Sequence, residues 1–221
     1  MHWCDWFEMD LSRFNPNDFW NILDAEEKER ANRFKIESVA KSFVLCRGFL
    51  KTVLSRYLFL KPNQVKFEYG QFGKPFVKSD VEFNLSHSQN TCIIAVSNIK
   101  VGIDCEFMAN KDFDKLSKRF FSKEEHYFIS ETKEIELKKE LFYRSWCMRE
   151  SMAKMTGEGL SKTLQNELIF NLNSMRIIKP TSCQNLNFKS LFLTEKNMYA
   201  VLCSEEILNP VYHYFNSFIH S

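Results

Sequence analysis

The stretch VGIDCE, Val101 to Glu106, places two carboxylates two positions apart at the end of an apolar run. Its residue types predict a strand, and successive side chains of a strand point to opposite faces. Asp104 and Glu106 would therefore point the same way, and Cys105 between them would point to the opposite, buried face. Two like charges side by side repel, so the pair is expected either at a solvated strand end or beside a cation.

The composition is ordinary for a folded protein of 221 residues, with 44% hydrophobic and 26% charged residues. The net charge of +2 gives no general case for binding to nucleic acid or to a membrane, because such proteins usually carry a strong basic excess. Any anion-binding site must therefore be local. The 22 phenylalanines are expected to form a core rather than an exposed binding surface.

The cysteine pattern and the first ten residues are typical of a protein of the cytoplasm. Seven cysteines occur without a CxxC pair, which argues against a zinc knuckle and against a disulfide framework. The first ten residues, MHWCDWFEMD, contain acids and no long apolar segment, and no apolar run is long enough to span a bilayer. We therefore expect a soluble cytoplasmic protein with reduced thiols.

Short β-rich segments lie on both sides of VGIDCE. Turns with Gly and Pro separate the earlier ones, and the strand-like segments are residues 64–69, 81–88, 91–97, 167–172, 175–180, 188–193 and 198–203. Helices are expected after an N-cap at Asp24, over residues 37–60 before Pro62, after Ser122, and over 134–156 before Gly157.

Helices followed by strands occur twice, which favours an α+β fold with mostly antiparallel sheets. We expect an N-terminal α+β lobe over residues 1–104 and a C-terminal α+β lobe over residues 105–221. The acidic pair would then lie at the junction between the lobes. Ligand clefts tend to form at such junctions.

Another acidic element lies in the long helix expected over residues 134–156. Its apolar stripe includes Leu141, Phe142 and Trp146, whereas Glu150 and Lys154 lie four apart on one face. Alone, this last pair could be an ordinary surface salt bridge. With Asp104 and Glu106 it would give a set of carboxylate oxygens, which suits a hard cation such as Mg²⁺ or Mn²⁺.

Five segments together resemble the Sfp-type phosphopantetheinyl transferases, within the holo-acyl carrier protein synthase superfamily. They occur in the family's order and are RFKIESVAKSFVLCR (33–47), FGKP (72–75), FNLSHS (83–88), VGIDCE (101–106) and FYRSWCMRESMAKMTGEGL (142–160). The resemblance spans residues 24–165. It implies a pseudo-dimer of two similar α+β lobes with the active site in the cleft between them, complete as a monomer.

The resemblance implies an enzyme that moves the 4'-phosphopantetheine arm of coenzyme A to a serine of an apo acyl or peptidyl carrier protein. The other product is adenosine 3',5'-bisphosphate. Asp104, Glu106 and Glu150 would bind Mg²⁺, with Mn²⁺ as an alternative, and Glu150 would also act as the base. Lys154 would reach the pyrophosphate, and His87 would contact a phosphate of coenzyme A.

Further coenzyme A contacts are implied by the same resemblance, at Ser86, His87, Lys154, Lys74, Arg30, Arg33 and Lys41. Arg47 is another cation of the first-half helices. On residue type alone, His87 could be structural, Lys74 an ordinary hairpin lysine, and the helical cations a solvated face. The chain departs from the family at Arg149, where Lys is usual, and at Lys41 and Ser42, where an arginine-rich pair is common.

Two other functions compete with this interpretation. A noncatalytic protein of the same fold could bind coenzyme A or a carrier, although the complete carboxylate set with Lys154 argues against it. A nucleic-acid-binding module that uses Lys and Phe is disfavoured by the net charge. For the carrier itself, an acidic helical bundle, Lys115, Lys118 and Arg119 could provide electrostatic steering.

Overall fold

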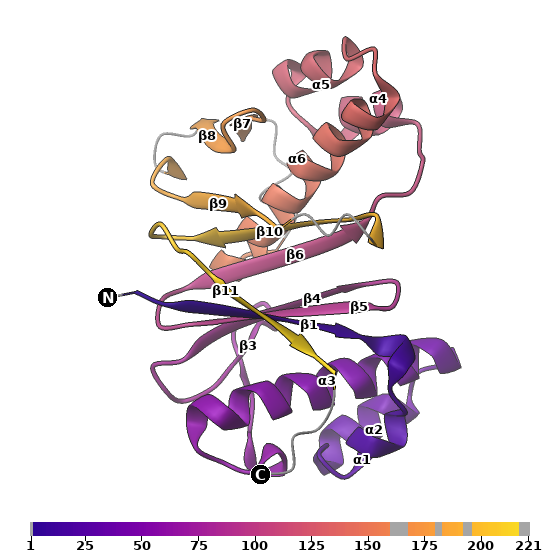
Figure 1. The fold of residues 1–221 in the computed structure, drawn as a ribbon, viewed down its shortest axis with the longest axis vertical. Helices are drawn as coiled ribbons and strands as arrows, with labels where there is room; N and C mark the ends of the chain where they lie inside the picture. The colour runs from indigo at the N-terminus through magenta and orange to yellow at the C-terminus, as the bar shows by residue number, and fades with distance from the viewer. Residues whose placement is uncertain (1, 160–167, 180–182, 192–195, 217–221) are drawn as a thin grey trace.

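The computed structural model describes residues 2–159, 168–179, 183–191 and 196–216. Two sheets lie between two long helices, α3 on one side and α6 on the other (Figure 1). The first sheet has the order β11-β1-β5-β4, with strands β1 Cys4–Asp10, β4 Glu82–Ser88, β5 Thr91–Ser97 and β11 Val211–Phe215. The second has the order β6-β10-β9, with strands β6 Val101–Phe107, β9 Asn187–Ser190 and β10 Met198–Ser204.

Neighbouring strands are antiparallel, except that β11 runs parallel to β1. Two short hairpins complete the described strands, formed by β2 Glu68–Tyr69 with β3 Pro75–Phe76, and by β7 Ile169–Asn171 with β8 Arg176–Lys179. The helices are α1 Pro16–Trp20, α2 Ala25–Asn32, α3 Glu37–Leu58, α4 Phe113–Phe120, α5 Lys123–Ser130 and α6 Ile135–Thr156. Within the described part of the chain, no helix combines the length and hydrophobicity of a membrane span.

The helix signals in the sequence are confirmed. Asp24 caps α2 in a capping box with Glu27, α3 ends before Pro62, and Gly157 ends α6 in the left-handed conformation at φ 74°. Ser122 caps α5 by accepting the Glu125 N–H, but the Glu125 side chain turns into the protein instead of closing a capping box.

Most predicted strands are present: β5 has the predicted bounds, β6 and β10 are one residue longer, and β7, β8 and β9 are shorter. The segment 64–69 is a strand only at its last two residues, because the 3₁₀ helix Pro62–Gln64 occupies its start. Helices α1 and α4 and strand β11 were not predicted. Residues 160, 167, 180, 192 and 193 of the predicted segments lie outside the described residues.

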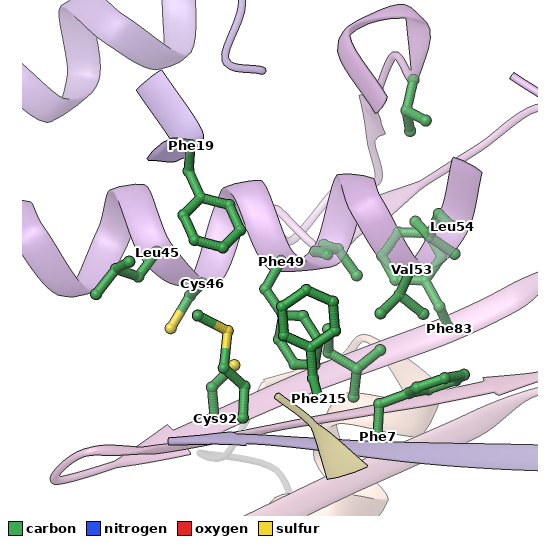
Figure 2. Close-up of a cluster of buried hydrophobic side chains, with 14 of the residues drawn as sticks. Phe7, Phe19, Leu45, Cys46, Phe49, Val53, Leu54, Phe83, Cys92 and Phe215 are labelled. Carbon is green, nitrogen blue, oxygen red and sulfur yellow. The ribbon is translucent and has the colours of Figure 1, made fainter. Parts of the chain in front are cut away.

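Three clusters of buried side chains join these layers. The first lies between α3 and the first sheet, where Phe49 and Val53 face Phe7, Phe83 and Phe215 (Figure 2). The second lies between α6 and the second sheet, and the third fills the space between the two sheets. The layers are therefore helix, sheet, sheet and helix, with phenylalanines prominent in the core as expected.

The predicted α+β fold in two lobes is confirmed. Each lobe packs a 22-residue helix, α3 or α6, on its own sheet. The division between residues 104 and 105 stays a prediction. In the structure this position lies inside β6, and β11 near the end of the chain adds to the first sheet.

Gly102 allows α6 to lie directly against β6. A Cβ atom at this position would be 1.9 Å from the Ser151 carbonyl oxygen and 2.5 Å from the Met155 backbone nitrogen. Both are backbone atoms of α6, so neither can rotate away. The glycine of VGIDCE therefore sets the distance between the strand that carries Asp104 and the helix that carries Glu150 and Lys154.

Replacing Gly102 with Ala should destabilise the protein by about 3 kcal/mol or more, because overpacking against backbone forces the helix away from the strand. Urea unfolding would measure this loss. Gly70→Ala is the matched control, since the nearest atom to its added Cβ would be the Lys74 carbonyl oxygen at an ordinary 3.7 Å. Equal stability of the two variants would contradict the close approach at Gly102.

Candidate active site

Asp104, Lys154 and Ser86 meet where β6, α6 and β4 come together. The Lys154 ammonium donates to Asp104 Oδ1 at 2.6 Å and to Ser86 Oγ at 2.8 Å. The Ser86 hydroxyl donates to the same Asp104 oxygen at 3.0 Å. Lys154 is therefore paired with Asp104 across the contact between strand and helix, rather than forming the surface pair with Glu150.

The second oxygen of Asp104 accepts no hydrogen bond from the part of the chain that the structure describes. Asp104 is 2% exposed, and its Oδ2 is a buried atom. A buried charged oxygen left unpaired is costly, so a ligand for it is expected. The expectation that Cys105 points to the opposite, buried face is confirmed, since Cys105 is 1% exposed in the cluster between the sheets.

Glu106 lies next along the same strand and is half-buried. The Ser88 hydroxyl donates to Glu106 Oε2 at 3.4 Å. Burial and the negative charge of Asp104 raise the pKa of Glu106 above its usual value, against the smaller opposing effects of Trp146 and Lys154. Trp146, assigned from the sequence to the core, is half-buried and packs against Phe120 and Phe142 at the edge of the second cluster.

Glu150 completes the acidic set from α6. Burial and the charge of Asp104 raise the pKa of Glu150 to about 7, although Lys154 acts in the opposite direction. Burial acts to lower the pKa of Lys154, but the charge of Asp104 and their hydrogen bond outweigh it and raise that pKa above its usual value. Lys154 therefore stays charged, while Glu106 and Glu150 lack full charge compensation.

The donor set fits a hard divalent cation. Among the described residues, no three His, Cys, Asp or Glu side chains are already arranged around a point that could hold a metal ion. Mg²⁺ commonly uses only one or two protein carboxylates and completes its shell with waters and substrate phosphates. The unpaired Asp104 Oδ2 and the raised pKa values of Glu106 and Glu150 are consistent with such an ion.

A groove of about 710 Å³ lies on the other face of β4, toward α3. Phe83, Leu85 and His87 alternate with Ser86 and Ser88 along the strand, so His87 points into this groove while the serines point to β6. His87 is exposed, and the reduced hydration of its ring together with the charge of Lys154 lowers its pKa. Of the other predicted coenzyme A contacts, Arg30 also lines this groove.

Arg47 gives the groove a buried cation. Its side chain is 10% exposed, its Nε lies 3.6 Å from Glu27, and its guanidinium packs on the ring of Phe67 at 4.7 Å. Arg47 Nη1 is buried and has no hydrogen-bond partner among the described residues. The sequence placed Arg47 among several helical cations and offered no means of ranking them, because burial depends on how α3 packs against its neighbours.

Three predicted contacts lie outside this groove. Arg33 lines a smaller hollow beside α2, and Lys41 lines a neighbouring groove with its ammonium 2.7 Å from Glu37. Lys74 donates to the Met155 carbonyl oxygen at 3.0 Å near the end of α6. The roles of these residues in coenzyme A binding stay predictions.

Arg149 lies next to Glu150 in sequence but points into the second lobe. It is 1% exposed and donates to both oxygens of Glu125, at 2.9 Å and 2.6 Å. Its guanidinium also packs between the rings of Phe121 and Phe170. A planar fork that binds a buried carboxylate in this way makes Arg149 a structural residue here, not a phosphate contact.

Sequence profiles of one family match most of the chain. The profile described as 4'-phosphopantetheinyl transferase superfamily matches residues 100–206. The profile described as 4'-phosphopantetheinyl transferase, N-terminal, matches residues 15–99. The first of these matches contains β6 and α6, and the second contains α3 and β4.

Individual relatives agree with the profiles. The chain is 38% identical over 167 residues to 4'-phosphopantetheinyl transferase HetI of Nostoc sp. strain PCC 7120, covering 72% of this chain and 70% of the relative. It is 31% identical over 158 residues to 4'-phosphopantetheinyl transferase Sfp of Bacillus subtilis strain 168, covering 71% and 70%. The human L-aminoadipate-semialdehyde dehydrogenase-phosphopantetheinyl transferase is 28% identical over 169 residues, covering 70% of this chain and 54% of the relative. The chain therefore belongs to the 4'-phosphopantetheinyl transferase superfamily.

Proposed function

We propose that this 4'-phosphopantetheinyl transferase moves the phosphopantetheine arm of coenzyme A to a serine of an apo acyl or peptidyl carrier protein. Adenosine 3',5'-bisphosphate is the other product. The observation that carries the proposal is the buried Asp104 Oδ2, which accepts no hydrogen bond from the described residues, together with a groove on the other face of β4 that is lined by Arg30, Arg47 and His87. The carboxylates could bind a cation and the groove could bind an anion. A nucleotide whose pyrophosphate binds a metal ion needs both.

Asp104, Glu106 and Glu150 would hold Mg²⁺, or Mn²⁺ in its place. When bound, the ion would withdraw charge from the attacked phosphorus and stabilise the leaving phosphate. Each of the three carboxylates has a feature that favours cation binding. Asp104 offers an oxygen that accepts no hydrogen bond from the described residues, and burial together with the charge of Asp104 raises the pKa values of Glu106 and Glu150.

Glu150 is proposed as the general base. The carrier serine oxygen attacks the phosphorus next to the pantetheine arm, the bond from that phosphorus to the bisphosphate oxygen breaks, and the serine proton passes to Glu150 directly or through water. A base is most effective with a pKa near the working pH and contributes roughly 10²- to 10⁴-fold. Without a bound ion, burial and the charge of Asp104 raise the pKa of Glu150 to about 7, and a cation held by this carboxylate would lower it.

Lys154 and His87 would contact the phosphates. The raised pKa of Lys154 supports a fixed positive charge that stabilises the departing oxygen, in preference to a proton donor. His87 lines the groove with Arg30 and Arg47, so these three side chains could surround the phosphorylated nucleotide. Lys115, Lys118 and Arg119 on α4 remain the proposed steering cations for an acidic carrier, and the enzyme is proposed to act as a cytoplasmic monomer.

The first prediction concerns the reaction itself. An apo acyl carrier protein incubated with this enzyme, coenzyme A and Mg²⁺ should gain the phosphopantetheine mass in intact-protein mass spectrometry, and EDTA should prevent the gain. Glu150→Gln should reduce the rate at least about 10²-fold, because the base is lost. Glu131→Gln, at an exposed glutamate remote from the carboxylates, should transfer at the normal rate.

Absence of transfer to several different apo carriers, with coenzyme A binding retained, would instead favour a noncatalytic binding protein. Normal turnover by Glu150→Gln would exclude Glu150 as the base.

The second prediction concerns stability in chelator. Glu150 has a pKa raised from 4.5 to about 7 in the folded protein, so the folded state binds its proton more tightly than the unfolded state does. Its favourable contribution is complete below pH 4.5 and is lost as the pH rises through about 7. The melting temperature of Glu150→Gln relative to wild type should therefore rise between pH 5 and pH 8. Glu131→Gln should show no such trend, and a flat difference for Glu150→Gln would contradict the shift.

The third prediction concerns the groove. If Arg47 Nη1 binds a phosphate of coenzyme A, Arg47→Met should weaken coenzyme A binding by at least about tenfold, as expected for a lost hydrogen bond to a charged group. Isothermal titration calorimetry would measure this loss. Arg56→Met, at an exposed arginine in the last turn of α3, is the matched control. Equal affinities of the two variants would place the nucleotide elsewhere.

A further inference from the structure

Strand β4 has different side chains on its two faces. Phe83 and Leu85 pack toward α3, whereas Asn84, Ser86 and Ser88 point toward β6. Strands β4 and β6 are edge strands of different sheets and form no backbone ladder with each other. The edge of β6 that faces β4 therefore has to satisfy its N–H groups in another way.

The β4 side chains accept these N–H groups one by one. Ile103 N–H donates to Asn84 Oδ1 at 2.8 Å, and Cys105 N–H donates to Ser86 Oγ at 3.2 Å. Phe107 N–H donates to Ser88 Oγ at 3.1 Å. A row of side chains thus replaces a backbone ladder between the two lobes.

Each serine also holds the carboxylate that precedes its N–H partner. Ser86 binds Asp104 Oδ1 and the Cys105 N–H. Two positions further along both strands, Ser88 binds Glu106 Oε2 and the Phe107 N–H. The spacing of two residues between the carboxylates matches the spacing of two residues between the serines. The same pair of contacts, one to a carboxylate and one to the next N–H, therefore occurs twice along the two strands.

The Ser86 hydroxyl has no capacity left for a further ligand. A hydroxyl provides one donor and two acceptor positions. Its hydrogen goes to Asp104, and its acceptor positions receive the Cys105 N–H and the Lys154 ammonium. Ser86 is 5% exposed and lies behind the carboxylate. This differs from the contact to coenzyme A that the family resemblance implies for Ser86.

We infer that Ser86 and Ser88 are positioning residues that hold Asp104 and Glu106 in place across the lobe interface, while Asn84 continues the same row. The inference rests on the proposed function for its catalytic consequence, but its structural part is independent of the reaction. Groups that orient metal-binding carboxylates typically matter by about 10- to 100-fold in metal affinity or activity.

Amide hydrogen exchange tests the contact directly. In wild type, the Cys105 and Phe107 amides should be protected although no strand pairs with that edge of β6. Ser86→Ala should speed exchange at Cys105 by at least about tenfold, since the acceptor is removed. Ser88→Ala should do the same at Phe107 and serves if Ser86→Ala fails to fold. Unchanged exchange at both amides would overturn the inference even if transfer proceeds normally.

Binding measurements separate positioning from a direct phosphate contact. Ser86→Ala should keep coenzyme A affinity in chelator within about twofold, and should weaken Mn²⁺ binding in the presence of coenzyme A by about tenfold. Ser97→Ala is the matched control, because Ser97 is also buried and accepts a backbone N–H, from Ile99. It should leave both affinities unchanged. A tenfold loss of coenzyme A affinity in chelator with normal Mn²⁺ binding would instead make Ser86 a phosphate ligand.

Discussion

The close approach of α6 to β6 at Gly102 is the constraint on which the candidate site depends. Backbone atoms of Ser151 and Met155 occupy the space that a side chain at this position would need. Because the helix lies this near the strand, Lys154 can reach Asp104 and Glu150 adds its charge to the same small volume. The glycine and the acids of VGIDCE therefore act together, the first setting the distance and the others supplying the charge.

The short distance between α6 and β6 gives the site more negative than positive charge. Asp104, Glu106 and Glu150 bring three carboxylates together, and Lys154 is the cation the structure pairs directly with one of them. Burial and the charge of Asp104 together raise the pKa values of Glu106 and Glu150, and Asp104 Oδ2 accepts no hydrogen bond from the described residues. A divalent cation would remove this excess of negative charge, which explains why a nearly neutral chain could bind a pyrophosphate.

Local signals in the sequence predicted much of this fold. Caps such as Asp24 and Gly157 and the alternation in β6 are read from neighbouring residues, so the long helices and most strands were predicted correctly. The pairing of β11 with β1 joins opposite ends of the chain, and no local pattern indicates such a contact.

Prediction of the site from the sequence is limited in the same way. The motif identified the carboxylates and Lys154, and the structure pairs Lys154 with Asp104, but the partners of Arg149 and Ser86 depend on how helices and strands pack. Arg149 is an instructive case, because the sequence shows only that it replaces the Lys usual in the family, whereas helical geometry turns its guanidinium toward Glu125. Alternation along FNLSHS places the two serines on one face of the strand and His87 on the other, and this pattern can be read from the sequence.

The most direct test of the account is a crystal structure of the enzyme with coenzyme A and Mn²⁺, with the metal located by anomalous scattering. The account predicts a peak within coordination distance of Asp104 Oδ2, next to Glu106 and Glu150, with the pyrophosphate completing the shell. A peak elsewhere, or no peak at Asp104 in an enzyme that transfers phosphopantetheine under the same conditions, would contradict it.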